Sequence, residues 1–163
     1  MNSKNKTVKN KARIKKIAIA CDHRGFEMKE KIIPFLKEKD YDVLDCGSYS
    51  EESSDYPDTM IKAAEEVSSG MCQRGIGICH SGIGSTIAAN KVKGVRAALC
   101  QSVKEAELSR LHNDANMLIL GSAFVRPKTL FPIIQKWLTT PFEGGRHERR
   151  VNKIKDYERK QRH

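Results

Sequence analysis

The order of apolar segments in this chain predicts an α/β fold, a three-layer α/β/α Rossmann-like domain with a five-stranded parallel sheet. Five short runs of β-branched or apolar residues alternate with stretches whose apolar residues recur at helical spacing. Strand followed by helix, five times over, is typical of a parallel sheet covered on both faces. The predicted strands span residues 17–21, 41–45, 75–79, 95–99 and 117–120.

The first predicted helix carries an amphipathic face from Phe26 to Lys37, and later helices are predicted around residues 61–67, 85–91, 103–111 and 130–138. A last helix, from residue 146 to about 160, follows two glycines and has few apolar positions, so we expect it to pack as an arm. The predicted organisation is a disordered basic tail at 1–14, an α/β domain at 15–145 and a C-terminal helical arm at 146–163.

Composition indicates an ordinary globular protein. The chain has 163 residues, 39% of them hydrophobic, and no run approaches the roughly 20 apolar residues that a membrane helix needs. No apolar signal-peptide core follows the charged N-terminus. The five cysteines are odd in number and show no C-x-x-C spacing, which favours reduced thiols in the cytoplasm.

Basic side chains are concentrated at the two ends of the chain. Of the formal net charge of +10, residues 1–16 carry +7 and residues 146–163 carry +5, so residues 17–145 carry −2. A basic tail can bind nucleic acid by releasing counterions. We expect a solvated tail instead, with no nucleic acid and no membrane as partner, and deletion of residues 1–14 would test the alternative.

The most informative segment is the one that follows the third predicted strand. The strand ends at Cys79 and continues into a loop of small residues, GIGICHSGIGST at 75–86. Glycines let the backbone approach a ligand closely, and the free amides of the loop and of the first helical turn can hold an anion. The same positive field favours the thiolate form of a cysteine. The pattern indicates a reactive Cys79, whereas we interpret the other four cysteines as core residues.

Several motifs, each at a predicted strand end or loop, resemble the B-type ribose-5-phosphate isomerases and their galactose-6-phosphate isomerase relatives. The resemblance covers about residues 16–160, in the order of that family. The matching motifs are CDHRGF at 21–26, DYP at 55–57, CHSGIGSTIAANK at 79–91, HNDAN at 112–116 and GGRH at 144–147.

The resemblance implies interconversion of ribose 5-phosphate and ribulose 5-phosphate, a step of the pentose phosphate pathway, without metal or other cofactor. Cys79 matches the base that removes the C2 proton, Ser81 the hydroxyl that contacts the reacting oxygens, and His112 the residue that opens the sugar ring. Some relatives use a Glu in the first helical turn as base, but Ser85 stands there in this chain, which favours Cys79. The amides expected to stabilise the enediolate are those of Gly82, Ile83, Gly84 and Ser85.

The resemblance also implies the residues that bind the substrate. Asp22 and Tyr56 match residues that line the sugar, and Asn113 matches one that holds hydroxyl groups. His23, Arg146 and Arg150 match those that receive the phosphate.

Two positions depart from the family pattern. The residue after the base is usually Gly, and here it is His80, which we expect to face solvent rather than supply a second imidazole. After the fifth strand relatives often have an Arg near the phosphate, and here Ala123 stands in its place, with Arg126 three residues later as a candidate substitute.

The sequence leaves four functions open. A ribose-5-phosphate isomerase leads, followed by an isomerase of a six-carbon substrate such as allose or galactose 6-phosphate. A non-catalytic sugar-phosphate-binding protein and a nucleic-acid-binding role of the tails are the others. The resemblance implies a homodimer or a dimer of dimers, with His112 and the two arginines acting beside the partner's cysteine loop.

Overall fold

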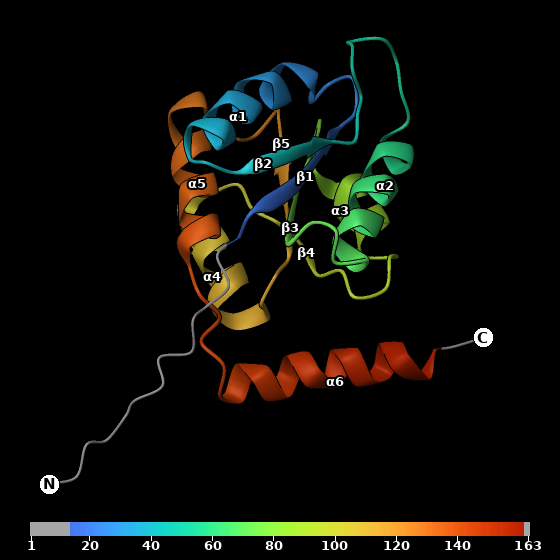
Figure 1. Ribbon diagram of the computed structural model, residues 1–163, viewed down its shortest axis with the longest axis vertical. Coiled ribbons are helices and arrows are strands. Elements are labelled where there is room, and N and C mark those ends of the chain that lie inside the picture. Colours follow the sequence, from blue (N-terminus) through green and yellow to red (C-terminus); the bar gives the residue numbers. More distant parts are fainter. Residues whose placement is uncertain (1–13, 162–163) are drawn as a thin grey trace, which may run out of the picture.

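A computed structural model describes residues 14–161 of the chain (Figure 1). The expected disordered tail falls almost wholly on residues 1–13, which lie outside the described residues, as do residues 162 and 163. The elements, in chain order, are β1 (Lys16–Cys21), α1 (Phe26–Glu38), β2 (Asp42–Asp45), α2 (Tyr56–Ser68), β3 (Arg74–Cys79), α3 (Ile83–Ala89), β4 (Ala97–Leu99), α4 (Val103–Asn113), β5 (Met117–Gly121), α5 (Pro127–Thr139) and α6 (Arg146–Lys160).

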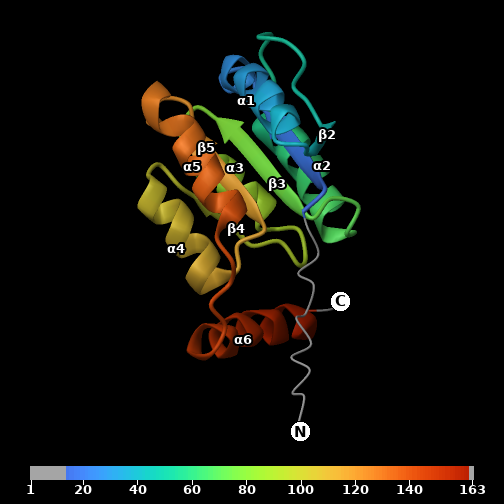
Figure 2. The same cartoon turned by 60° about the vertical axis from the view of Figure 1, so that its left-hand side comes forward.

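The predicted fold class is confirmed. All five strands are parallel, in the order β2-β1-β3-β5-β4, and helices cover both faces of the sheet (Figures 1 and 2). Side chains alternate along β1: Ile17 and Ile19 join one core with α1, α4 and α5, while Ala18 and Ala20 join a second core with α2 and α3. Burying one Ile side chain contributes about 1.5–3 kcal/mol, so this alternation fixes the register of the sheet.

The short helix α3 differs from its prediction. We expected residues 85–91, but the helix begins at Ile83 and ends at Ala89. It begins early because Gly82 takes a left-handed φ of 80° and lets the chain turn directly from the loop into the helix. It ends early because the Asn90 side chain bonds the backbone of Ala97 through both its donor and its acceptor, at 2.9 Å each.

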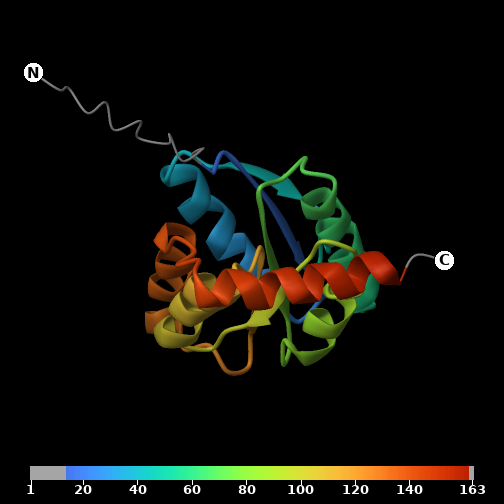
Figure 3. The same ribbon diagram turned by 90° about the horizontal axis from the view of Figure 1, so that it is seen from below.

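The last helix, α6, lies across one end of the sheet (Figures 1 and 3). Glu158 Oε1 accepts a hydrogen bond of 2.9 Å from the amide of Gly94, which precedes β4, so this is the amino end of the strands. Its few apolar residues form a stripe at helical spacing, in which Val151 is buried, whereas Ile154 and Tyr157 are 55% and 66% exposed. The stripe is therefore only partly covered within one chain. None of the helices within residues 14–161 is both long and apolar enough to cross a membrane.

Candidate active site

The loop from β3 to α3 holds the Cys79 thiol against backbone amides. Cys79 is the last residue of β3, it is only 4% exposed, and its Sγ accepts a hydrogen bond of 3.2 Å from the amide of Gly82. The Ser81 hydroxyl accepts one of 3.3 Å from the amide of Ile83. The first amides of a helix have no carbonyl partner one turn earlier, so the donors of Gly84 and Ser85 face the same region. This arrangement stabilises negative charge at the thiol and beside it.

The glycines of this loop are required by close contacts. A Cβ on Gly84 would lie 2.7 Å from the hydroxyl oxygen of Tyr56, the first residue of α2. A Cβ on Gly82 would lie 3.2 Å from the amide nitrogen of Gly121, at the end of β5. The loop therefore lies directly against Tyr56, and this predicted sugar-lining residue is brought to the cysteine.

Asp22 and His23 lie at the same end of the sheet, directly after β1. The amide of Asp22 donates to the carbonyl of Ile78, at 3.1 Å, which ties this turn to the strand that carries the thiol. The Asp22 Oδ1 accepts hydrogen bonds of 2.9 Å from the amides of Arg24 and Gly25, so the carboxylate is buried with partners. Asp22 is thus both a structural residue of the turn and a neighbour of the site.

Two contacts that the sequence did not indicate position the residues around His23. The Ser54 hydroxyl accepts from the His23 amide at 3.1 Å, and the Ser54 backbone lies 3.2 Å from His23 Nδ1. Lys29 is fully buried and pairs with Asp45 at 2.7 Å while donating to the Ser48 carbonyl at 2.6 Å. The loop between β2 and α2 is thereby held against the end of β1.

His112 and Asn113 lie at the opposite end of the sheet from Cys79. They form the last turn of α4, and β5 begins four residues after Asn113; the carbonyl of Asn116, just before this strand, accepts from the amide of Gly75 at 2.9 Å. From Gly75 to Cys79 the strand makes four steps of about 3.3 Å, a separation of roughly 13 Å. Within one chain, the structure does not bring His112 to Cys79.

Buried charges hold the last turn of α4 in place. Asp114 has a left-handed φ of 46° and ends the helix, and its carboxylate lies 2.8 Å from Arg110 Nη1 and 3.3 Å from Arg96 Nη2. Arg110 is 3% exposed and also donates to the carbonyl of Ala115, while Arg96 Nε donates to the carbonyl of Asn113. Because an ion pair with the buried Arg110 is costly to break, this network fixes the backbone at the end of α4, from which His112 projects.

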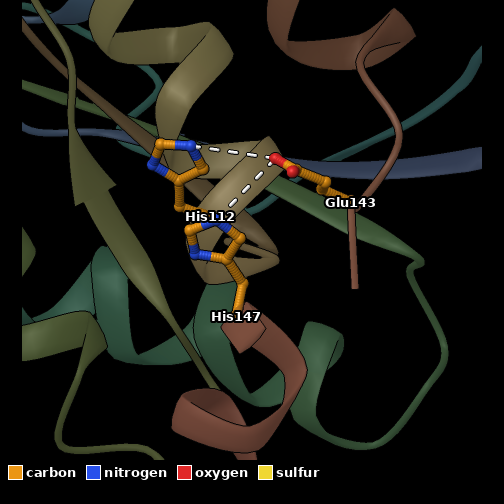
Figure 4. A group of neighbouring side chains, drawn as sticks. All are labelled: His112, Glu143 and His147. Carbon is orange, nitrogen blue, oxygen red and sulfur yellow. Dashed lines mark ion pairs between the residues drawn. The ribbon is translucent and has the colours of Figure 1, made fainter. Parts of the chain in front are cut away.

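A second histidine stacks on His112, as Figure 4 shows. The rings of His112 and His147 are 4.1 Å apart between centroids and 6° from parallel. The Glu143 Oε2 lies 3.9 Å from His112 Nε2 and 3.7 Å from His147 Nε2. Burial lowers the pKa of His147, and the nearby His112, Arg146 and Arg150 lower it further, although Glu143 opposes them. His147 is therefore neutral at neutral pH.

Sequence reasoning did not select Glu143 or His147 as site residues. His147 was part of a recognised motif, and its spacing of four residues from Glu143 across a glycine pair was the available signal. Arg146 and Arg150 are both exposed in the first turns of α6, beside this pair. Arg146 Nε donates to His147 Nε2 at 3.4 Å. Around the two stacked imidazoles, the amino end of the sheet thus gathers the Glu143 carboxylate and the guanidinium groups of Arg146 and Arg150.

The remaining cysteines differ from Cys79 in their surroundings. All four are buried free thiols, and burial raises the pKa of Cys21, Cys46 and Cys100 to about 11 each and raises that of Cys72 as well. These thiols stay protonated at neutral pH and act as core residues.

The two departures from the family pattern both lie at the carboxyl end of the sheet. His80 is exposed, as expected, and its carbonyl accepts from the amide of Ala123 at 3.0 Å. Arg126 is exposed and precedes α5. It therefore lies at the same end of the sheet as His23.

Comparison with known proteins decides the family. Residues 17–154 match the model of the ribose/galactose isomerase family. The chain belongs to this family. Ribose-5-phosphate isomerase B of Escherichia coli is 44% identical over 141 residues, which are 86% of this chain and 95% of that protein. The resemblance found in the sequence motifs is confirmed.

Solved structures of ribose/galactose isomerase family members have the same fold. Ribose-5-phosphate isomerase B of Clostridium thermocellum matches with a TM-score of 0.88 at 49% identity, over 90% of this chain and 99% of that one. The Mycoplasma genitalium enzyme with bound ribulose-5-phosphate matches with a TM-score of 0.86 at 44% identity, over 90% of this chain and 97% of that one. The family likeness therefore extends over nearly the whole described chain.

Proposed function

We propose that this protein is an aldose–ketose isomerase that interconverts ribose 5-phosphate and ribulose 5-phosphate, with Cys79 as the base. The observation that carries the proposal is the thiol at the end of β3, which accepts from the Gly82 amide inside a loop of further free amides. The Escherichia coli and Clostridium thermocellum relatives, which are 44% and 49% identical, are ribose-5-phosphate isomerases B. The Mycoplasma genitalium relative was solved with ribulose-5-phosphate bound.

The proton transfer uses only groups of this loop. The Cys79 thiolate takes the proton from C2 of the open-chain aldose, and the electron pair moves to O1 to form the enediolate. Amides of the loop and the Ser81 hydroxyl stabilise that charge. Ser81 relays the O2 proton to O1, and the thiol returns its proton to C1, which leaves the ketone at C2. The proposed steps need no metal.

Ring opening and phosphate binding require a second copy of the chain. Sugar phosphates exist mostly as closed rings, and an acid–base group must open them before the C2 proton becomes accessible. His112 matches the family residue for this task, yet it lies at the far end of the sheet from the thiol of its own chain. We therefore assign the role to His112 of the partner subunit. His23 then receives the phosphate together with Arg146 and Arg150 of the partner subunit.

Exposed apolar side chains support a dimer. Ile83 and Ile87 on α3 and Phe124 after β5 are each 57–58% exposed beside the Cys79 loop, and Ile154 and Tyr157 are exposed on α6. Apolar residues clustered at a functional end of a protein are typical of a surface that another subunit covers. In the dimer that we propose, a two-fold axis brings the amino end of one sheet to the carboxyl end of the other. We also place the enzyme in the cytoplasm, because its cysteines are all free thiols.

A substrate panel tests this function. Ketose formation is followed from ribose, allose and galactose phosphates, each with and without a chelator. We expect fastest turnover with ribose 5-phosphate and no loss with chelator. Faster turnover of a six-carbon substrate would show that the protein is an allose- or galactose-phosphate isomerase of the same family. Binding of a sugar phosphate without turnover of any substrate in the panel would show a non-catalytic binding protein.

A further inference from the structure

The cluster of His112, Glu143 and His147 contains three metal-ligating side chains from three segments. His112 ends α4, Glu143 lies in the linker after α5, and His147 is in the first turn of α6 (Figure 4). One ligand atom of each lies within 4.8 Å of the others. The amide of Glu143 donates to the carbonyl of Leu111 at 3.1 Å, so the linker is fixed beside His112.

The donor set selects a class of ion. Two imidazole nitrogens and one carboxylate oxygen suit Zn²⁺ and similar transition ions, whereas Mg²⁺ and Ca²⁺ prefer oxygen ligands alone. Tetrahedral zinc with bonds of ~2.0–2.2 Å places its ligand atoms about 3.3 Å apart. The two nitrogens lie 3.9 and 3.7 Å from Glu143 Oε2, and the Glu143 side chain is 56% exposed and can rotate to close this difference. The two rings are stacked 6° from parallel, so the His112 side chain, which is 37% exposed, must also turn until the lone pairs of both rings point at one ion.

Neighbouring cations oppose an ion at this cluster. Arg146 Nε donates to His147 Nε2 at 3.4 Å and so occupies the lone pair that a metal would use. The Arg150 guanidinium also lies close enough to disfavour positive charge at His147. The bond from Arg146 is long, however, and Arg146 is exposed, so its side chain can leave. The zinc affinity is therefore lower than it would be without neighbouring cations, and Arg146 makes the largest contribution to this decrease.

We propose that His112, Glu143 and His147 bind one Zn²⁺ per chain, and that this ion reversibly inhibits the enzyme by occupying Nε2 of His112. The binding part stands on the geometry of the cluster alone, whereas the inhibition rests on the proposed role of His112 in ring opening. The ion is an inhibitor and not a cofactor, because it removes from use the imidazole that the sugar ring needs.

Zinc binding is measured on the full chain by competition with a chromophoric chelator after removal of metal. We expect one site per chain, weakened at least tenfold in Glu143→Gln and in His147→Gln. His80→Gln, which changes an exposed histidine at the other end of the sheet, and Cys79→Ala should bind as tightly as the unchanged chain. Arg146→Ala should bind more tightly, which zinc held elsewhere in the chain would not do.

Equal affinity in the unchanged, Glu143→Gln and His147→Gln chains would overturn the site, provided that circular dichroism shows all three folded. Inhibition is tested separately, relative to the zinc-free rate of each variant. We expect zinc to slow isomerisation of the cyclic aldose phosphate, chelator to restore it, and His147→Gln to resist. If zinc binds at the cluster without slowing the reaction, the proposed inhibition is wrong. If the unchanged chain has no isomerase activity, the proposed function is wrong, and the binding measurement still tests the zinc site.

Discussion

The two ends of the parallel sheet carry different chemistry. The carboxyl end gathers a thiol, a hydroxyl and backbone amides around Cys79, with Asp22 and Tyr56 beside them. The amino end gathers the stacked imidazoles of His112 and His147 with the arginines of α6. We propose that the first end carries out the proton transfer between carbons and that the second opens the ring and binds the phosphate. Neither end alone offers the whole set that a sugar-phosphate isomerase needs.

The difference also appears in how each end is built. At the carboxyl end the groups are held by backbone geometry, because Gly82 turns the chain and the amides follow from the start of α3. At the amino end they are held by side chains, because Arg96, Arg110 and Asp114 fix the last turn of α4. Substitutions should therefore act on separate steps at the two ends.

The largest effect is expected at the thiol. Cys79→Ala should lower turnover by ~10³-fold or more, since loss of a general base commonly costs 10²–10⁴. Substrate binding should survive, because the phosphate contacts lie elsewhere. Steady-state kinetics and direct binding measure both, with Cys100→Ala as the control that leaves turnover near normal. Near-normal turnover in Cys79→Ala would contradict the assignment of the base.

Thiol alkylation sharpens the contrast among the cysteines. At pH 8 iodoacetamide should modify Cys79 first and inactivate the enzyme, because the folded pKa values of Cys21, Cys46 and Cys100 are about 11. Sugar phosphate should slow the modification. Peptide mapping identifies the alkylated residue. Equal labelling of all five cysteines would contradict the prediction that Cys79 is the most reactive thiol.

A smaller and directional effect is expected at the ring-opening histidine. His112→Asn should slow the reaction of the cyclic aldose phosphate by about 10²-fold or more, and that of the open-chain ketose far less. Single-turnover rates in the two directions measure this, with His80→Asn as the matched control. Equal losses in both directions would refute ring opening as the role of His112 and leave Cys79 untouched.

The smallest effects are expected at the phosphate. Arg146→Ala and Arg150→Ala should each raise KM by roughly 10- to 150-fold, since charge-assisted hydrogen bonds are worth about 1.5–3 kcal/mol. Arg149→Ala, exposed on the same helix but outside the predicted set, is the control. Arg126→Ala should raise KM only if it replaces the arginine that Ala123 lacks. An unchanged KM in both Arg146→Ala and Arg150→Ala would show that other residues bind the phosphate.

The fold could be predicted from the sequence because its signals are local. Alternation of strand and helix patterns gave the five parallel strands, and the last helix spans residues 146–160 as expected. The start of α3 was wrong by two residues, because a glycine in the left-handed region can begin a helix without a polar cap. Burial of Lys29 was missed, since its partner Asp45 becomes a neighbour only when β2 lies beside β1.

The candidate site was predicted less completely for a related reason. Cys79 and its loop lie in one contiguous segment, so spacing alone indicated their chemistry. The stacking of His147 on His112 and the approach of Glu143 depend on the packing of the α5–α6 linker against α4. No sequence spacing encodes that contact. The family itself was recognisable and is confirmed, whereas the residue roles remain predictions.

Mixing two inactive chains tests most directly whether the two ends meet across a dimer. Cys79→Ala and His112→Asn chains are unfolded together, refolded and checked for heterodimers. In a heterodimer with shared sites, one site collects both altered residues and the other is whole, so an equal mixture should regain roughly a quarter of normal activity. Heterodimers that recover no activity beyond either parent would show that each site is built within a single chain, and would contradict the account.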